Sequence, residues 1–112
     1  MAYNTDFLVT GGAGFIGSNI VHRLLEQGRS VRVFDNLSTG REVNLEDVRG
    51  DIEFVEGDLR DVDAVVGAVA GVRHVLHLGA LPSVPRSVAD PATSNAVNVT
   101  GTLNVLIAAR DA

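Results

Sequence analysis

The sequence predicts one α/β domain built on a doubly wound parallel sheet. Short apolar segments alternate with longer amphipathic ones along the 112 residues, and no linker or low-complexity segment separates them. Strands that are separated by helices cannot pair as hairpins, so we expect them to lie parallel and to be joined by right-handed crossovers. The length suits one domain or part of one. The 46% content of hydrophobic residues is typical of globular chains.

The individual elements follow from apolar periodicity and from the residues that begin and end helices. The polar stretch after the second strand indicates only a weak helical turn near Leu45. The last helix begins in the usual way, because an aspartate cap at Asp90 precedes a proline at the first helical position. Four apolar runs predict strands at residues 7–10, 30–35, 52–56 and 75–78. Three amphipathic segments predict helices over residues 14–27, 61–70 and from Asp90-Pro91 onward.

Composition excludes several classes of function. Nine arginines and no lysine stand against 14 acidic residues, and the net charge of −5 argues against a nucleic-acid or anionic-membrane surface. Without cysteine there are no disulfides and no thiolate chemistry. No signal peptide is visible and no apolar run reaches the ~20 residues of a membrane span, so we expect a cytoplasmic protein. The three histidines, His22, His74 and His77, suit packing or surface roles, and we expect no metal site.

A glycine-rich turn lies between the first strand and the first helix. Residues 10–17 (TGGAGFIG) place Gly11, Gly14 and Gly17 at the spacing G-x-x-G-x-x-G. A bound diphosphate needs backbone N–H groups that point at it and no Cβ in the way, and the helix N-terminus adds partial positive charge. A mononucleotide P-loop is excluded because Ser18 stands where that motif needs lysine. The turn therefore predicts a diphosphate site.

The second predicted strand ends in Asp35, 18 residues after Gly17 (35 − 17 = 18). This is near the ~20-residue spacing at which an acidic residue accepts hydrogen bonds from an adenosine ribose. Because a carboxylate there repels a 2′-phosphate, it favours NAD over NADP. Two alternatives stay open: Arg41 could bind a 2′-phosphate, and Asp35 could merely open a turn with Asn36.

The other two strands also end in residues that suit a ligand. After the third strand, Asp58 could accept a hydrogen bond from an adenine amino group while Leu59 contacts the ring. The fourth strand ends in His-Leu-Gly-Ala (residues 77–80), whose small residues let the backbone pass close to a ligand. Parallel strands bring their carboxyl ends to one edge of the sheet, so these segments are expected to meet there.

Five segments in chain order make a specific resemblance: TGGAGFIG, DNLSTG, EGDLRD, HLGALPSVPRSVADP and NVTGTLNVL. They resemble the N-terminal part of the extended short-chain dehydrogenase/reductases, and most of all the NAD-dependent nucleotide-sugar epimerases and dehydratases of the UDP-glucose 4-epimerase type. The similarity spans residues 7–110. It implies a partial Rossmann fold, with a parallel sheet of about four strands in the order 3-2-1-4 and helices on both faces, and NAD as the cofactor.

Gly17, the last glycine of the turn, would let the first helix lie close to the sheet and is included in the predicted cofactor site. The resemblance implies which other residues contact the cofactor. Asn98 resembles an asparagine that ties the last helix to the sheet, and Ser83 lies in a segment at the edge of the family's sugar site. The implied contacts are Gly11, Gly14, Phe15 and Ile16 with the pyrophosphate; Asp35 and Asn36 with the adenosine ribose; Ser38, Thr39 and Gly40 along the adenosine side; Asp58 and Leu59 with adenine; and Leu78, Gly79 and Ala80 beneath the middle of the cofactor.

Family members also carry a later strand with Ser or Thr, a Tyr-x-x-x-Lys helix and a C-terminal substrate domain. This sequence has no lysine, and its single tyrosine, Tyr3, precedes the first strand. We therefore expect residues 1–112 to form an NAD(H)-binding Rossmann half-domain with no catalytic residue, inactive alone. Two alternatives remain: part of an active 4-epimerase completed by a C-terminal polypeptide, which would bring a nucleotide sugar, or an α/β scaffold that binds nothing.

The chain is also expected to associate with a second copy of itself. The fourth strand would be an unpaired edge of the sheet, and the apolar face of the last helix, residues 99–107, would lack partners. Uncovered edges and apolar faces favour pairing with another chain. The expectation is a homodimer or larger assembly that buries one of these two surfaces.

Overall fold

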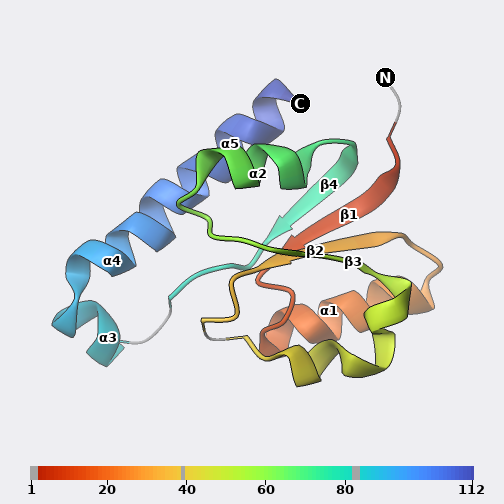
Figure 1. Cartoon of the computed structure of the whole chain (residues 1–112), viewed down its shortest axis with the longest axis horizontal. Helices are drawn as coiled ribbons and strands as arrows, with labels where there is room; N and C mark the ends of the chain where they lie inside the picture. Colours follow the sequence, from red (N-terminus) through yellow and green to blue (C-terminus); the bar gives the residue numbers. More distant parts are fainter. Residues whose placement is uncertain (1–2, 39, 82–83) are drawn as a thin grey trace.

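The computed structural model describes residues 3–38, 40–81 and 84–112 and shows a parallel sheet between two layers of helices (Figure 1). The strands are β1 (Thr5–Thr10), β2 (Val31–Asp35), β3 (Glu53–Glu56) and β4 (Val72–His77). They are ordered β3-β2-β1-β4, and all three neighbouring pairs are parallel. The order 3-2-1-4 and the doubly wound α/β class are therefore confirmed.

Each face of the sheet has its own core, because successive side chains of a strand point to opposite faces. Leu8 packs among residues of α2 (Val62–Val69) and α5 (Gly101–Asp111), whereas Val9 packs on the other face, toward α1 (Phe15–Glu26). Figure 1 shows α2 and α5 on one side of the sheet and α1 on the other. Helices thus cover both faces, as expected.

Three parts of the structure extend the pattern read from the sequence. The pattern predicts a weak turn near Leu45, whereas the structure has a ten-residue 3₁₀ helix, η1 (Glu42–Asp51). Leu45 anchors it, because its side chain is fully buried in the core beside α1. Strand β4 begins three residues before the predicted strand, and a short helix, α3 (Val84–Ala89), follows where only a loop is expected.

The predicted long C-terminal helix is present as a continuous run of three segments. It consists of α4 (Pro91–Asn95), a π-helical turn η2 (Ala96–Thr100) and α5. The Asp90 carboxylate accepts the N–H of Thr93 at 3.2 Å, which makes it the expected N-cap. None of the helices within the described ranges combines the length and the hydropathy that a membrane-spanning helix needs.

Candidate functional site

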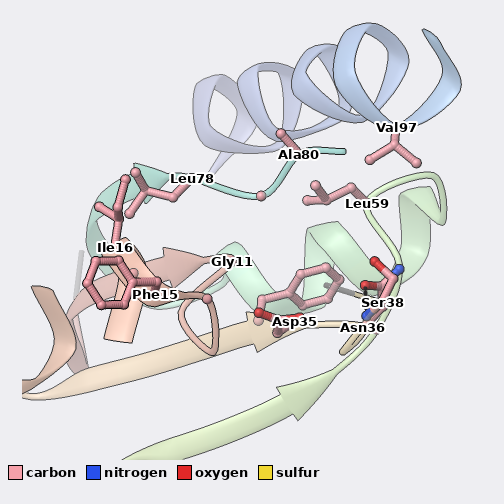
Figure 2. Close-up of a pocket in the computed structure, with 15 residues that line it drawn as sticks. Gly11, Phe15, Ile16, Asp35, Asn36, Ser38, Leu59, Leu78, Ala80 and Val97 are labelled. Carbon is pink, nitrogen blue, oxygen red and sulfur yellow. Dashed lines mark hydrogen bonds between the residues drawn. The ribbon is translucent and has the colours of Figure 1, made fainter. Parts of the chain in front are cut away.

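A cavity of about 440 Å³ opens at the carboxyl ends of the strands. It lies at the switch point, where the chain leaves β1 toward one face of the sheet and β4 toward the other, which is where open α/β sheets bind ligands. Figure 2 shows Phe15, Ile16 and Leu78 toward one end of the cavity and Asp35 and Asn36 toward the other. Twelve of the fifteen predicted site residues line it: Gly11, Gly14, Phe15, Ile16, Gly17, Asp35, Asn36, Ser38, Leu59, Leu78, Gly79 and Ala80.

The glycine-rich turn forms the floor of the cavity. Gly11 has a φ of +70°, and a Cβ on it would come within 2.8 Å of the Gly79 nitrogen. A Cβ on Gly17 would overlap the Gly11 carbonyl oxygen. The turn therefore holds three backbone segments in contact: the end of β1, the start of α1 and the segment after β4.

The N-terminus of α1 faces this cavity with its first N–H groups available. The first turn of a helix has no intrahelical acceptors for these groups. Gly14 is the N-cap and has no side chain that could accept them, and the first turn carries no acidic residue. Phe15 and Ile16 follow, and both line the cavity. This cradle fits a diphosphate, because it offers N–H donors, partial positive charge and no Cβ in the way.

Asp35 is buried at the end of β2 and connects two loops of the site. Its Oδ2 accepts the backbone N–H of Ala13 at 3.0 Å, and its Oδ1 accepts that of Leu37 at 2.7 Å. Leu37 has a φ of 62°, an uncommon conformation for a residue other than glycine. Asp35 therefore opens a turn, as one interpretation of the sequence holds, and lines the cavity as the other requires. A carboxylate oxygen has two lone pairs, so each can accept a second hydrogen bond from a ligand.

Two of the predicted site residues that the structure describes, Gly40 and Asp58, are not among those that line the cavity. Gly40 lies behind Asp35, where a Cβ would come within 2.9 Å of Oδ2. Asp58 binds Arg60, with 2.6 Å between Arg60 Nη2 and Asp58 Oδ2. This Arg60 contact, with a smaller one from Asn36, lowers the pKa of Asp58 to about 2, so the carboxyl is ionised at neutral pH. Thr39 and Ser83 lie outside the described residues.

Three residues of the lining are not among those that the sequence predicts: Phe34, Gly57 and Val97. The Phe34 ring lies under Gly57, where a Cβ would come within 2.6 Å of the ring. Figure 2 shows Val97 and Leu59 on the side of the cavity opposite Asp35. Gly57 sits between Glu56 and Asp58 in the third-strand motif, and this glycine was the signal available in the sequence.

Residues outside the lining hold the site in place. The Asn98 amide accepts the N–H of Leu81 at 2.7 Å and donates to its carbonyl at 3.0 Å, so it ties the long helix to the segment after β4. Arg41, the residue that leaves NADP open, donates its backbone N–H to the Ala13 carbonyl at 3.0 Å, and its side chain is exposed. It therefore lies next to the glycine-rich turn.

The histidines differ in their surroundings. His22 contacts the Ser18 carbonyl and the Asp47 carboxylate, and both raise its pKa. His74 is exposed on β4, and its ring lies 5.2 Å from that of Phe7. Over the described part of the chain, no group of three or more His, Asp or Glu side chains is arranged to hold a metal ion.

A parallel 3-2-1-4 sheet with a glycine-lined cavity at its switch point defines a Rossmann-type domain. Residues 7–112 match the model of a protein family described as the NAD dependent epimerase/dehydratase family. The chain therefore belongs to the NAD-dependent epimerase/dehydratase family.

Similar proteins agree with this assignment. The chain is 46% identical over 107 residues to a UDP-glucose 4-epimerase of Mycolicibacterium smegmatis, covering 92% of this chain and 34% of that protein. Among solved structures, the UDP-glucose 4-epimerase of Thermus thermophilus in complex with NAD is 47% identical, with a TM-score of 0.86 and coverage of 95% and 34%. A dTDP-glucose 4,6-dehydratase of Streptomyces venezuelae with NAD bound is 37% identical, with a TM-score of 0.88 and coverage of 95% and 36%. The chain spans about a third of the length of these relatives.

Proposed function

We propose that this chain binds NAD(H) in the cavity at the carboxyl ends of its strands, as the cofactor-binding part of a nucleotide-sugar epimerase or dehydratase. The observation that carries the proposal is the cradle of N–H groups at the start of α1, which lies beside the buried carboxylate of Asp35. The NAD dependence of the family supports it, as do similar structures solved with NAD.

Different residues of the cavity would bind different parts of the cofactor. Gly11, Gly14 and the first turn of α1 would bind the diphosphate. Asp35 and Asn36 would bind the adenosine ribose, with adenine in the apolar space beside Leu59. The segment 78–80 would lie along the middle of the cofactor. When bound, NAD supplies a hydride acceptor; these residues orient it and keep water from one side of it.

The proposal includes catalytic inactivity of residues 1–112 alone. The sequence has no lysine, so the Tyr-x-x-x-Lys pair implied by the resemblance has no candidate in it. A second candidate function is participation in an active enzyme completed by further residues, and the coverage of about a third of the relatives favours it. Sugar turnover by this chain only in the presence of a relative's C-terminal part would support that second function. A cytoplasmic location belongs to the proposal. So does the absence of nucleic-acid and membrane partners, which the net charge of −5 supports.

Calorimetric titration is expected to show binding of NAD and of ADP, with NADP weaker than NAD by about tenfold or more, because the Asp35 carboxylate would repel the 2′-phosphate. At a free concentration of 100 Kd, NAD should raise the free energy of unfolding by about 2.7 kcal/mol. Binding of none of the three would support the scaffold alternative. Tighter binding of NADP than of NAD would instead give Arg41 the role of binding the 2′-phosphate.

Self-association is expected through the apolar face of the long helix, residues 99–107 of η2 and α5. Val99 and Leu106 expose 60% and 62% of their surface, and Leu103 and Ile107 on the same face are also exposed. Light scattering on the purified chain should give a mass above that of the 11.8 kDa monomer. Leu103→Glu should shift the measured mass to that of the monomer, because it would bury a charge in the interface.

The matched control is Val88→Glu, since Val88 is 77% exposed on α3, away from this face. It should leave the mass unchanged. A monomeric wild-type chain would contradict the proposed self-association. An oligomer that resists Leu103→Glu would point to the open edge of β4 instead, since Leu103 does not line the groove beside that edge.

A further inference from the structure

A chain of hydrogen bonds runs from the wall of the cavity to the long helix through His77. At the end of β1, the Thr10 Oγ1 lies 2.6 Å from His77 Nδ1. On the other side of the ring, His77 Nε2 lies 3.0 Å from the Thr102 Oγ1 on α5. The Thr102 hydroxyl in turn donates to the Asn98 carbonyl at 2.6 Å. None of these four residues lines the cavity.

The partners of the Thr10 hydroxyl determine the direction of this chain. Its oxygen accepts two backbone N–H groups, that of Leu78 at 3.0 Å and that of Gly79 at 3.1 Å. The Leu78 N–H is bifurcated, because it also donates to the Thr10 carbonyl at 3.1 Å. A hydroxyl oxygen has two lone pairs, so a third donor would find none, whereas the hydroxyl proton still needs an acceptor. His77 Nδ1 is therefore the acceptor and carries no proton.

The other ring nitrogen must then be the donor. The Thr102 hydroxyl donates its proton to the Asn98 carbonyl, so the hydroxyl oxygen can accept a hydrogen bond from His77 Nε2–H. Burial also lowers the pKa of His77, which favours the neutral ring. With the Nε2–H tautomer, the protons of the Thr10 hydroxyl, the His77 ring and the Thr102 hydroxyl each have one acceptor. The Nδ1–H tautomer would leave the Thr10 hydroxyl proton without one.

These hydrogen bonds hold the segment of Leu78 and Gly79, which forms a wall of the cavity. Leu78 and Gly79 both line it, and the Gly79 backbone touches Gly11 so closely that a Cβ on Gly11 would lie 2.8 Å from the Gly79 nitrogen. The side chain of Asn98 fixes the same segment three residues after Leu78, at Leu81. The helix turn 98–102 therefore fixes the wall at both ends, at Leu81 through Asn98 and at Leu78 through Thr102, His77 and Thr10.

We infer that His77 is a positioning residue: as the Nε2–H tautomer it connects Thr102 on the long helix to Thr10 and so sets the place of Leu78 and Gly79 against the cofactor. The effect on NAD rests on the proposed function, whereas the tautomer and the placement of the wall do not. His77 does not line the cavity and acts through the Thr10 hydroxyl.

Thr102→Val tests this inference, because valine has the shape of threonine and residue 102 lies outside the cavity lining. NMR on the ¹⁵N-labelled wild-type chain without ligand should show His77 as the Nε2–H tautomer. In Thr102→Val this preference should weaken, and the amides of Leu78 and Gly79 should exchange with solvent on the order of threefold to tenfold faster. The Kd for NAD should rise by a similar factor, since the wall loses its fixed position.

Thr102→Ser is the matched control, since it keeps the hydroxyl, and all three readouts should stay within about twofold of the wild type. A merely structural threonine would lower stability in the valine variant without moving the tautomer or the Kd. An Nδ1–H or charged ring in the wild type would overturn the inference, as would amide exchange that is unchanged in Thr102→Val. A wild-type chain that binds no NAD would refute the proposed function, and the tautomer and exchange measurements would still decide the role of His77.

Discussion

Gly17→Ala is expected to destabilise the fold and to weaken NAD binding on the order of a hundredfold. The added Cβ would overlap the Gly11 carbonyl oxygen and lie 2.9 Å from the carbon of that carbonyl and 3.0 Å from the Gly12 Cα. All three contacts are with backbone, so no side-chain rotation relieves them, and the start of α1 must move away from the turn. Overpacking of this kind costs about 1–3 kcal/mol or more.

The loss of binding should come in addition to the loss of stability, because the shift displaces the N–H groups that would hold the diphosphate. Misplacement by about 1 Å lowers activity on the order of a hundredfold in enzymes, and a similar loss of NAD affinity is expected here. Denaturant unfolding and calorimetric titration measure the two effects separately. Wild-type affinity in this variant would show that the cofactor does not use this turn.

Gly67→Ala is the matched control for Gly17→Ala. Gly67 also lies in a helix, but a Cβ there has nothing within 4 Å and the residue is exposed. Because alanine favours helix over glycine, this variant should gain about 0.5–1 kcal/mol of stability. Its NAD affinity should equal that of the wild type.

Asp35→Ala should weaken NAD binding on the order of tenfold to a hundredfold, the loss expected when hydrogen bonds to a charged acceptor are removed. Two causes act together. The ribose would lose its acceptor, and the N–H groups of Ala13 and Leu37 would lose theirs, which loosens both the glycine-rich turn and the loop after β2. The free energy of unfolding should fall by about 1–3 kcal/mol for each N–H left unsatisfied.

Titration with NADP separates these two causes. Removal of the carboxylate also removes the repulsion of a 2′-phosphate, so NADP should lose less affinity than NAD in Asp35→Ala. Asp51→Ala is the control, because Asp51 is an exposed carboxylate at the end of η1, and its substitution should change neither affinity. Equal losses for NAD and NADP would mean that Asp35 acts only by holding the loops.

Much of the fold could be predicted because its signals are local in the sequence. Each strand except β4 was placed to within two residues, since apolar runs that end in glycine or aspartate mark strands independently of their neighbours. The length of η1 could not be predicted, because its sequence has little amphipathic pattern. The helix is held by the burial of one side chain, Leu45, in the core beside α1.

The cavity was predicted where backbone geometry alone demands a residue type. Gly11 and Gly17 stand out in the sequence because no Cβ fits at either position. Val97 carries no such signal, since a valine on an apolar helix face is ordinarily a core residue. Its place in the lining depends on where the long helix lies, and contacts such as that of Gly101 with Leu59, where a Cβ would come within 2.8 Å, decide this.

Spacing along the chain is enough to predict the parallel α/β architecture, the glycine-rich turn and the acidic residue at the end of β2. Three other features are visible only in the folded chain: Asp58 pairs with Arg60 outside the lining, Asp35 holds two loops, and His77 lies between Thr10 and Thr102. The positions of Asp35 and His77 depend on which distant segments pack together. The direction of a hydrogen bond is fixed only when all of its neighbours are in place.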